Sequence, residues 1–156
     1  MGTVTVSLSG TRSGTRGNGP GTSVGLLLLR VAVATVFTVH GYVKILGGHF
    51  DRTVALFMTV NIPAPEISAW VIGALELGGG VLLAVGFWTR PIAAVLAIEM
   101  AVVIVRVRWA QGFLGAAEFE LVLLAACLAL TATGAGRFSL EASSRARPAR
   151  NRRGRT

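Results

Sequence analysis

The stretch that most constrains the fold is Val24–Leu46, a long apolar run that carries three basic side chains. At about 1.5 Å per residue, a helix of this length crosses a bilayer core of roughly 30 Å. The run contains Arg30, His40 and Lys44, and a charge near the bilayer centre costs at least about 2.5–3.5 kcal/mol on insertion scales. A spanning helix must therefore turn these side chains toward protein, water or the interface, and we expect the rest of the chain to cover them.

The composition extends this interpretation to most of the chain. Hydrophobic residues make up 53% and charged residues only 14%, and the apolar residues come in long blocks, which is typical of a polytopic membrane protein. We predict an all-α, integral membrane four-helix bundle over residues 24–136, with transmembrane helices at about 24–46, 67–88, 91–109 and 118–133. The connection between the first and second of these helices has too few apolar residues to span a bilayer. We therefore predict a short interfacial helix there. That helix is either an ordinary loop helix or a lid over a site.

Both ends of the chain differ in composition from the apolar part. Residues 1–23 are rich in Gly, Ser and Thr, and predict a disordered basic tail that is retained, because Arg30 interrupts the apolar region of any signal peptide. Residues 137–156 are rich in arginine and predict a second disordered tail. The excess of basic residues on the side of the tails places both termini in the cytoplasm of a multi-pass plasma-membrane protein. The arginine tail is expected to lie on anionic lipid headgroups, and no nucleic-acid partner is expected.

Ionisable residues inside the apolar segments are the candidate site. Counting depth along the helices places Arg30 and Glu99 together in the inner half of the bundle, as a structural ion pair. The outer half holds four further groups: His40, Lys44, Glu76 and Glu118. Because buried ionisable groups in a membrane are costly, we interpret these four as a ligand-binding or proton-relay site rather than as packing alone. Glu120 points about 200° away from Glu118 on a helix, so only one of the two can line the interior.

The residue types also exclude several kinds of redox centre. The single cysteine, Cys127, lies in an apolar run and is expected to be a small core residue. One cysteine excludes an internal disulfide, a CxxC pair and a multi-cysteine cluster. Two histidines are too few for most haem or metal arrangements, and no metal site is predicted. No flavin or iron–sulfur motif, nucleotide-binding glycine loop or hydrolase motif is present, so any redox role would need a bound cofactor or a partner.

The ordered set of motifs resembles the DoxX family of small four-helix bacterial membrane proteins, over about Leu26–Glu141. The residues that carry the resemblance are His40-Gly41 with Lys44, Asn61-Ile62-Pro63-Ala64-Pro65, Glu76-Leu77-Gly78-Gly79-Gly80, Gly86 with Thr89-Arg90, Glu99-Met100, Glu118, and Gly134-x-Gly136-Arg137-Phe138-Ser139-Leu140-Glu141. The chain departs from the family in its long tails and in Glu141, where the family commonly has aspartate. Arg30 also matches the family pattern.

The resemblance implies a plasma-membrane bundle linked to thiosulfate:quinone oxidoreductase subunits and to a mycobacterial membrane oxidoreductase complex. The first hypothesis is therefore a quinone-associated subunit, at most the membrane subunit of an oxidoreductase complex, with a soluble redox enzyme as partner. The alternative is a non-catalytic docking or assembly protein that binds a soluble enzyme through its tails or through residues 47–66. A small-solute or lipid transporter is the third hypothesis, and it would favour a homo-oligomer because four spans are few for transport.

Overall fold

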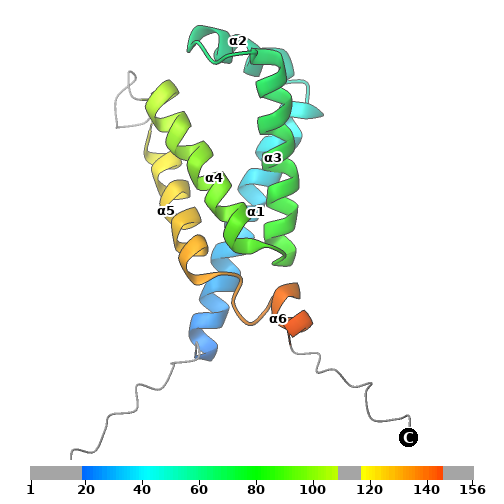
Figure 1. The fold of residues 1–156 in the computed structure, drawn as a ribbon, viewed down its shortest axis with the longest axis vertical. Helices are drawn as coiled ribbons and strands as arrows, with labels where there is room; N and C mark the ends of the chain where they lie inside the picture. Colours follow the sequence, from blue (N-terminus) through cyan, green and yellow to red (C-terminus); the bar gives the residue numbers. More distant parts are fainter. Residues whose placement is uncertain (1–18, 109–116, 146–156) are drawn as a thin grey trace, which may run out of the picture.

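The computed structural model describes residues 19–108 and 117–145, and over these residues every regular element is a helix. The elements are α1 (Pro20–Ile45), α2 (Phe50–Thr59), α3 (Pro65–Val85), α4 (Thr89–Val103), the π-helix η1 (Ile104–Arg108), α5 (Glu118–Thr133) and α6 (Leu140–Arg145) (Figure 1). The predicted all-α class is confirmed. By length and composition, α1 and α3 are the two described helices that could cross a membrane. The predictions for 1–18, 109–116 and 146–156 lie outside the described residues.

Proline and glycine set the ends of several helices. Both α1 and α3 have proline in the first turn, where a backbone N–H has no partner within the helix in any case. At the end of α3, Gly86 adopts φ 71°. Its N–H donates to the carbonyl of Leu83, and the N–H of Phe87 donates to the carbonyl of Leu82. These two bonds close the last turn, which a left-handed glycine permits without strain.

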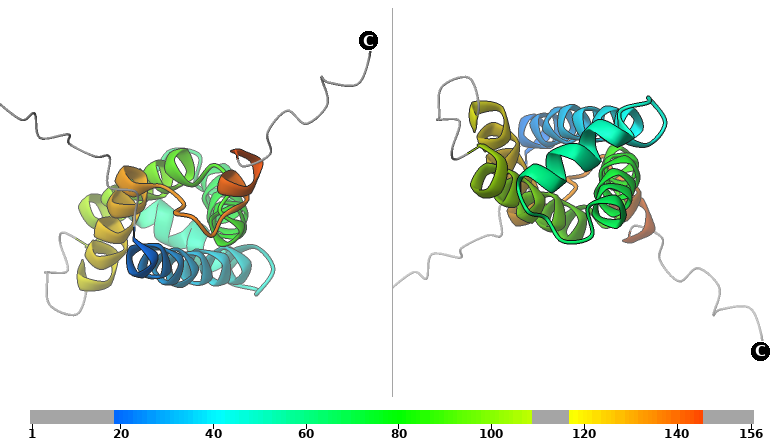
Figure 2. Two further views of the ribbon diagram at one scale, coloured as in Figure 1. Left: turned by 90° about the horizontal axis from the view of Figure 1, so that it is seen from below. Right: turned by 90° about the horizontal axis from the view of Figure 1, so that it is seen from above.

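The long helices pack as two pairs that lie side by side. Contacts are most numerous between α1 and α3 and between α4 and α5, and α3 joins the two pairs by packing on α4 (Figures 1 and 2). Glycines bring α1 and α3 together. A Cβ atom added at Gly41 would lie 2.7 Å from the carbonyl oxygen of Gly73, and one at Gly80 would lie 2.6 Å from the backbone nitrogen of Thr38. Small residues of this kind let membrane helices approach closely.

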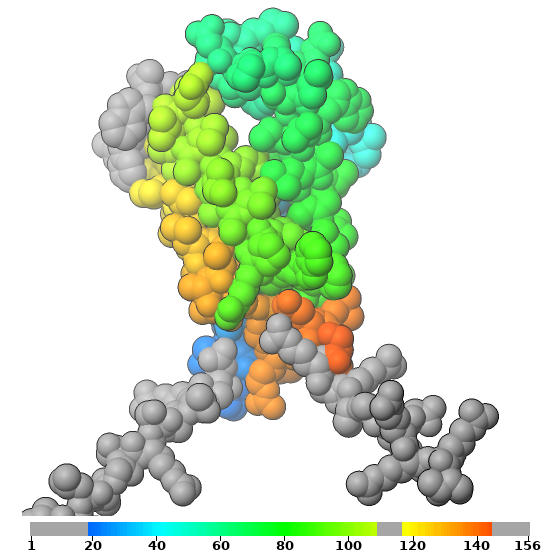
Figure 3. Space-filling model, viewed as in Figure 1, coloured from blue at the N-terminus to red at the C-terminus, as the bar shows by residue number. Residues whose placement is uncertain are grey.

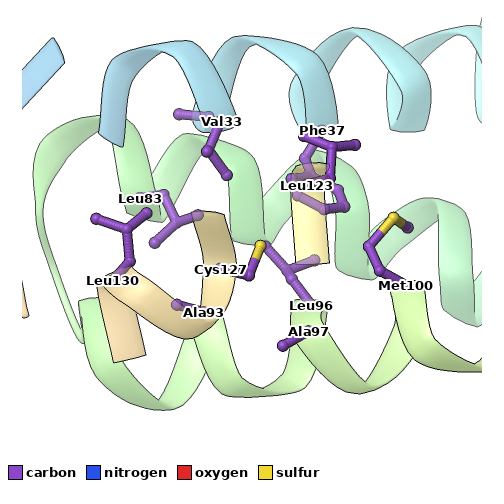
Figure 4. Close-up of a cluster of buried hydrophobic side chains, with 11 residues drawn as sticks. Val33, Phe37, Leu83, Ala93, Leu96, Ala97, Met100, Leu123, Cys127 and Leu130 are labelled. Carbon is purple, nitrogen blue, oxygen red and sulfur yellow. The ribbon is translucent and has the colours of Figure 1, made fainter. Parts of the chain in front are cut away.

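The apolar core lies between the two pairs and draws on all four long helices (Figure 4). Its buried members are Val33, Ala34, Phe37, Leu83, Ala93, Leu96, Ala97, Met100, Leu123, Cys127 and Leu130. Cys127 is fully buried, in agreement with the core role expected for it. These contacts hold α4 and α5 against α1 and α3, and so fix the depth of the ionisable residues on each helix.

The two ends of the molecule carry different elements. At one end, which we call the α2 end, Val54 and Phe57 of α2 pack on Ala69 of α3. At the opposite end, the α6 end, α6 lies beside the end of α3 (Figures 1 and 2). The N–H of Glu141 donates to the carbonyl of Gly86. Residues 137–145, predicted as part of a disordered tail, are therefore placed against the helices in the structure.

Candidate functional site

An ion pair between α1 and α3 forms the centre of the candidate site. Lys44 Nζ donates to Glu76 Oε1 at 2.6 Å, with the carboxyl side chain only 3% exposed and that of Lys44 24% exposed. Both residues were predicted for the site, and the structure brings them together. Helix geometry explains the pairing, because Gly41 and Gly73 allow α1 and α3 to touch one turn away from each residue. The lysine thus neutralises a carboxylate that would be costly to bury alone.

Glu99 joins this pair from α4. Its side chain is 5% exposed and interacts with the carboxyl of Glu76 and, over a longer range, with Lys44. The sequence analysis assigned Glu99 instead to a structural ion pair with Arg30. The structure does not form that pair: between the described residues, the side-chain ion pairs are Lys44–Glu76 and one at the start of α5. Glu99 lies near the middle of the continuous helix formed by α4 and η1. A small error in the depth counted along that helix therefore assigns Glu99 to the wrong half of the bundle.

Arg30 has a different set of partners. It is 2% exposed, and its guanidinium donates to the carbonyl oxygens of Ala135 at 2.5 Å and Phe138 at 2.6 Å. A Cβ atom added at Gly86 would lie 2.6 Å from Arg30 Nη1, so the glycine makes room for the guanidinium. Arg30 therefore fixes the segment after α5 against α1 and α3. These contacts explain why residues 137–145 lie against the helices although they include charged side chains.

A groove opens beside Lys44 at the α2 end. It has a volume of about 480 Å³ and is lined from α1 by Val39, His40, Val43 and Lys44, and from the following turn and α2 by His49, Arg52, Thr53 and Leu56. The space-filling view shows an opening beneath α2, between α3 and α4 (Figure 3). The lining combines an apolar surface with basic side chains, so the groove suits a ligand that has an apolar body and polar acceptor atoms.

His40 lies at the edge of this groove rather than inside the helix pairs. It is exposed, and its Nδ1 lies 2.8 Å from the carbonyl oxygen of Val36. A carbonyl can only accept, so Nδ1 carries the proton, and Nε2 of the neutral ring is then an acceptor. The ring also lies 6.0 Å from that of Phe119 on α5. His40 and Lys44 are thus placed one turn apart on the same groove, one as acceptor and one as donor.

The structure reverses the roles of the two glutamates at the start of α5. Glu118, the predicted site residue, is exposed, whereas Glu120 is 7% exposed. Arg108 Nε donates to Glu120 Oε1 at 2.8 Å. The sequence shows that only one of the two can face inward, but the rotation of α5 decides which one, and that rotation depends on packing with α4.

Sequence reasoning missed the polar contacts made by η1. Arg106 donates to the carbonyl oxygens of Val60 and Asn61 in the connection between α2 and α3, both at 3.2 Å. A π-helix shifts the side chains that follow it relative to an α-helix, and such segments are frequent at functional sites. The signal available in the sequence was the pair of arginines, Arg106 and Arg108, at the end of the third apolar block.

The family comparison covers the part of the chain that holds these contacts. The DoxX family model matches residues 25–109, which is more than half of the chain and includes Arg30, His40, Lys44, Glu76 and Glu99. The chain belongs to the DoxX family. The resemblance inferred from the motifs is thereby confirmed.

Individual DoxX relatives come from several bacteria. The protein named "Putative oxidoreductase CatD" of Bacillus subtilis is 36% identical over 118 residues, covering 76% of this chain and 85% of CatD. Inner membrane protein YphA of Escherichia coli is 35% identical over 68 residues, covering 44% and 47% of the two chains. An uncharacterized membrane protein of Mycobacterium tuberculosis is 31% identical, covering 74% and 78%. No solved structure matches this DoxX protein significantly. The apolar helices and these relatives together identify a membrane protein.

Proposed function

We propose that this DoxX protein is the membrane subunit of an oxidoreductase complex and binds a quinone in the groove at the α2 end. The observation that carries the proposal is the groove itself, where Lys44 links an apolar-lined cavity of about 480 Å³ to the buried carboxyls of Glu76 and Glu99. The name of the Bacillus relative, which calls that protein an oxidoreductase, points in the same direction.

The groove residues fit a quinone by their chemistry. Val39, Val43 and Leu56 offer an apolar surface for a ring or an isoprenoid chain, and Lys44 offers N–H donors for a carbonyl oxygen. A quinone takes up two electrons and two protons when it is reduced. Lys44 would donate one of these protons, and His40, exposed at the edge of the groove, would take up the second from solvent at Nε2 and pass it to the quinone. The residues therefore account for binding and for protons.

Electrons require a second protein. The sequence carries no motif for haem, flavin or an iron–sulfur cluster, so a soluble partner with its own redox cofactor would deliver them. In this proposal α1, α3, α5 and the continuous helix of α4 and η1 all span the plasma membrane as a four-helix bundle. The predicted orientation puts the α6 end in the cytoplasm and the groove near the outer surface. The arginine tail would then lie on anionic lipid headgroups of the cytoplasmic surface, and the partner that delivers electrons would dock at the α2 end, beside the groove.

The test is the quinone content of the purified protein. Val39→Trp places a large ring in the groove, and Val31→Trp is the matched control, because both valines are exposed on α1 (53% and 45%) and only Val39 lines the groove. Protein purified in mild detergent would be extracted and its quinones quantified by mass spectrometry per mole of protein. We expect native protein and Val31→Trp to carry quinone, and Val39→Trp to lose most of it. Equal quinone in both variants, or none in native protein supplied with quinone, contradicts the proposal.

A docking role is the second candidate function, and the Arg30 contacts favour testing it. These contacts fix the start of the basic C-terminal region at the α6 end, where it would be presented to a soluble enzyme. If the protein only docks a partner, deletion of residues 146–156 releases that partner while the quinone content stays unchanged. A partner that remains bound after the deletion excludes these residues as the docking segment.

A further inference from the structure

Two carboxyl groups meet in the interior of the molecule with one lysine. Glu76 is 2% exposed and Glu99 is 5% exposed, and Lys44 donates to one oxygen of Glu76. If both carboxyls are ionised, Glu76 Oε2 and both oxygens of Glu99 have no hydrogen-bond donor within the described part of the chain. The three groups then carry a net charge of one negative unit in a medium of low polarity, which is a costly arrangement. The cluster lacks one positive charge and one donor.

We propose that Glu76 and Glu99 share a single proton and so form a proton-binding site that exchanges with the groove through Lys44. One proton supplies both missing features: it makes the three groups neutral, and it provides the donor for a hydrogen bond between the two carboxyls. Their side chains are close enough for such a bond. Two carboxyls in contact commonly hold one proton between them, because like charges at this distance do not both persist.

A metal ion fits this site less well than a proton. Hard cations take about six or more oxygen ligands, and even zinc takes four ligands in all. No group of three or more His, Cys, Asp or Glu side chains able to hold a metal occurs within residues 19–108 and 117–145. The ammonium of Lys44 also occupies Glu76 Oε1 and repels a second cation. A proton needs only the two carboxyls.

Among the described residues, the groups around the carboxyl pair point to exchange through the groove. On α1, Lys44 lines the groove and is partly exposed, with His40 one turn away on the same groove. On α5, the Cys127 thiol interacts electrostatically with Glu99, while Glu120 is engaged by Arg108 of η1. Toward the α6 end, the residues of α4 that precede Glu99 include Leu96 and Ala97, which belong to the apolar core (Figure 4). The proton therefore enters and leaves from the groove.

Proton release is balanced in simple steps. A proton leaves Lys44 Nζ for an acceptor in the groove, and the shared proton moves from the carboxyl pair to Nζ. The three groups then carry one net negative charge until a proton is taken up again from the groove. This inference rests on the proposed function only for the identity of the acceptor, and the test below needs no quinone.

The decisive experiment is infrared spectroscopy of the purified protein at about pH 7, where exposed carboxyls are ionised. A protonated carboxyl has a carbonyl stretching band that carboxylates lack, and the band shifts when the protein is transferred to D₂O. We expect native protein to show this band with an intensity of about one carboxyl. Glu99→Gln should abolish it, because Glu76 is then the lone acid opposite Lys44 and the new amide supplies the donor. Glu118→Gln, which alters an exposed carboxyl, should leave the band unchanged.

Three outcomes of this experiment would overturn the proposal. Absence of the band in native protein means that both carboxyls are ionised, and this result requires no variant to fold. Persistence of the band in folded Glu99→Gln assigns the proton to another residue, such as Glu120. Loss of the native band on addition of Na⁺ at constant pH would show that the pair binds a metal cation instead. If the infrared band behaves as expected but the protein carries no quinone, the proposed ligand is refuted and the proton site stands.

Discussion

The close contact between α1 and α3 makes a sharp prediction, because it contrasts two glycines with opposite surroundings. A Cβ atom added at Gly41 would lie 2.7 Å from the carbonyl oxygen of Gly73 and 2.8 Å from Cα of Leu77. Normal separations are about 3.5–4.0 Å, so the two backbones must move apart by roughly 1 Å. A Cβ atom added at Gly78 meets nothing within 4 Å. Gly41→Ala and Gly78→Ala therefore differ in packing but share the same change in composition.

The magnitude follows from comparing the two variants. Replacing a glycine inside a helix by alanine stabilises the helix by roughly 0.5–1 kcal/mol, and this gain is common to both. Forcing extra volume into a tight contact costs typically about 1–3 kcal/mol, and here the opposing atoms belong to the backbone, so they cannot rotate away. We expect Gly78→Ala to be neutral or slightly more stable than native protein, and Gly41→Ala to be less stable than Gly78→Ala by about 1–3 kcal/mol.

The assay is reversible unfolding in mixed micelles of mild detergent and dodecyl sulfate, followed by tryptophan fluorescence. Both variants and the native protein would be measured in the same micelles, so that the difference between midpoints reports on the contact alone. Equal midpoints for the two alanine variants would refute the reasoning, because they would show that α1 and α3 do not approach each other at Gly41. A destabilised Gly78→Ala would show that its face is covered.

Three further predictions concern the buried charges. Arg30→Met removes two hydrogen bonds to backbone carbonyls, and each bond to a charged group contributes roughly 1.5–3 kcal/mol. Residues 137–145 should then become cleavable by protease in a limited digest. Arg30→Lys should be cleaved more slowly than Arg30→Met. Glu120→Gln should lower stability by about 1–3 kcal/mol because it weakens a partly buried ion pair, whereas Glu118→Gln should stay within about 0.5 kcal/mol; equal midpoints would contradict the inward position of Glu120. Lys44→Met leaves a buried carboxylate unpaired and should cost about 3–5 kcal/mol, and adding Glu76→Gln should recover most of this loss in the same unfolding assay.

The helical class and its ends were predictable because their signals are local. Apolar blocks and the glycines after α3 and α5 act within a few residues, so the sequence is enough to locate them. The start of α1 is an exception, because residues 1–23 were predicted as a disordered tail and the helix begins at Pro20. The pairing of Lys44 with Glu76 was also within reach, since both residues lie in the half of the molecule where they were expected. The membership of the DoxX family followed from the ordered motifs.

The errors concern partners rather than elements. Arg30 was paired with Glu99 on the assumption that a buried cation needs a buried anion. The structure gives it the backbone carbonyls of Ala135 and Phe138 instead, and backbone acceptors leave no mark in a sequence. Glu118 was preferred to Glu120 because the rotation of α5 about its axis cannot be read from a helix whose apolar residues surround it. In both cases the neighbouring sequence favours two arrangements equally, and tertiary packing decides between them.

The contacts of Arg30 also have a consequence for the order of synthesis. Ala135 follows Arg30 by 105 residues, and at about 5–20 residues per second the ribosome needs roughly 5 to 20 seconds to make that stretch. During this interval α1 has left the ribosome with a basic residue whose acceptors do not yet exist, at a cost of about 2.5–3.5 kcal/mol if the residue is near the bilayer centre. The first helix is therefore poorly prepared to settle alone in the membrane. Its final position is expected to be reached only when Ala135 and Phe138 have emerged, so nascent chains that stop before residue 134 should leave α1 accessible to the insertion machinery.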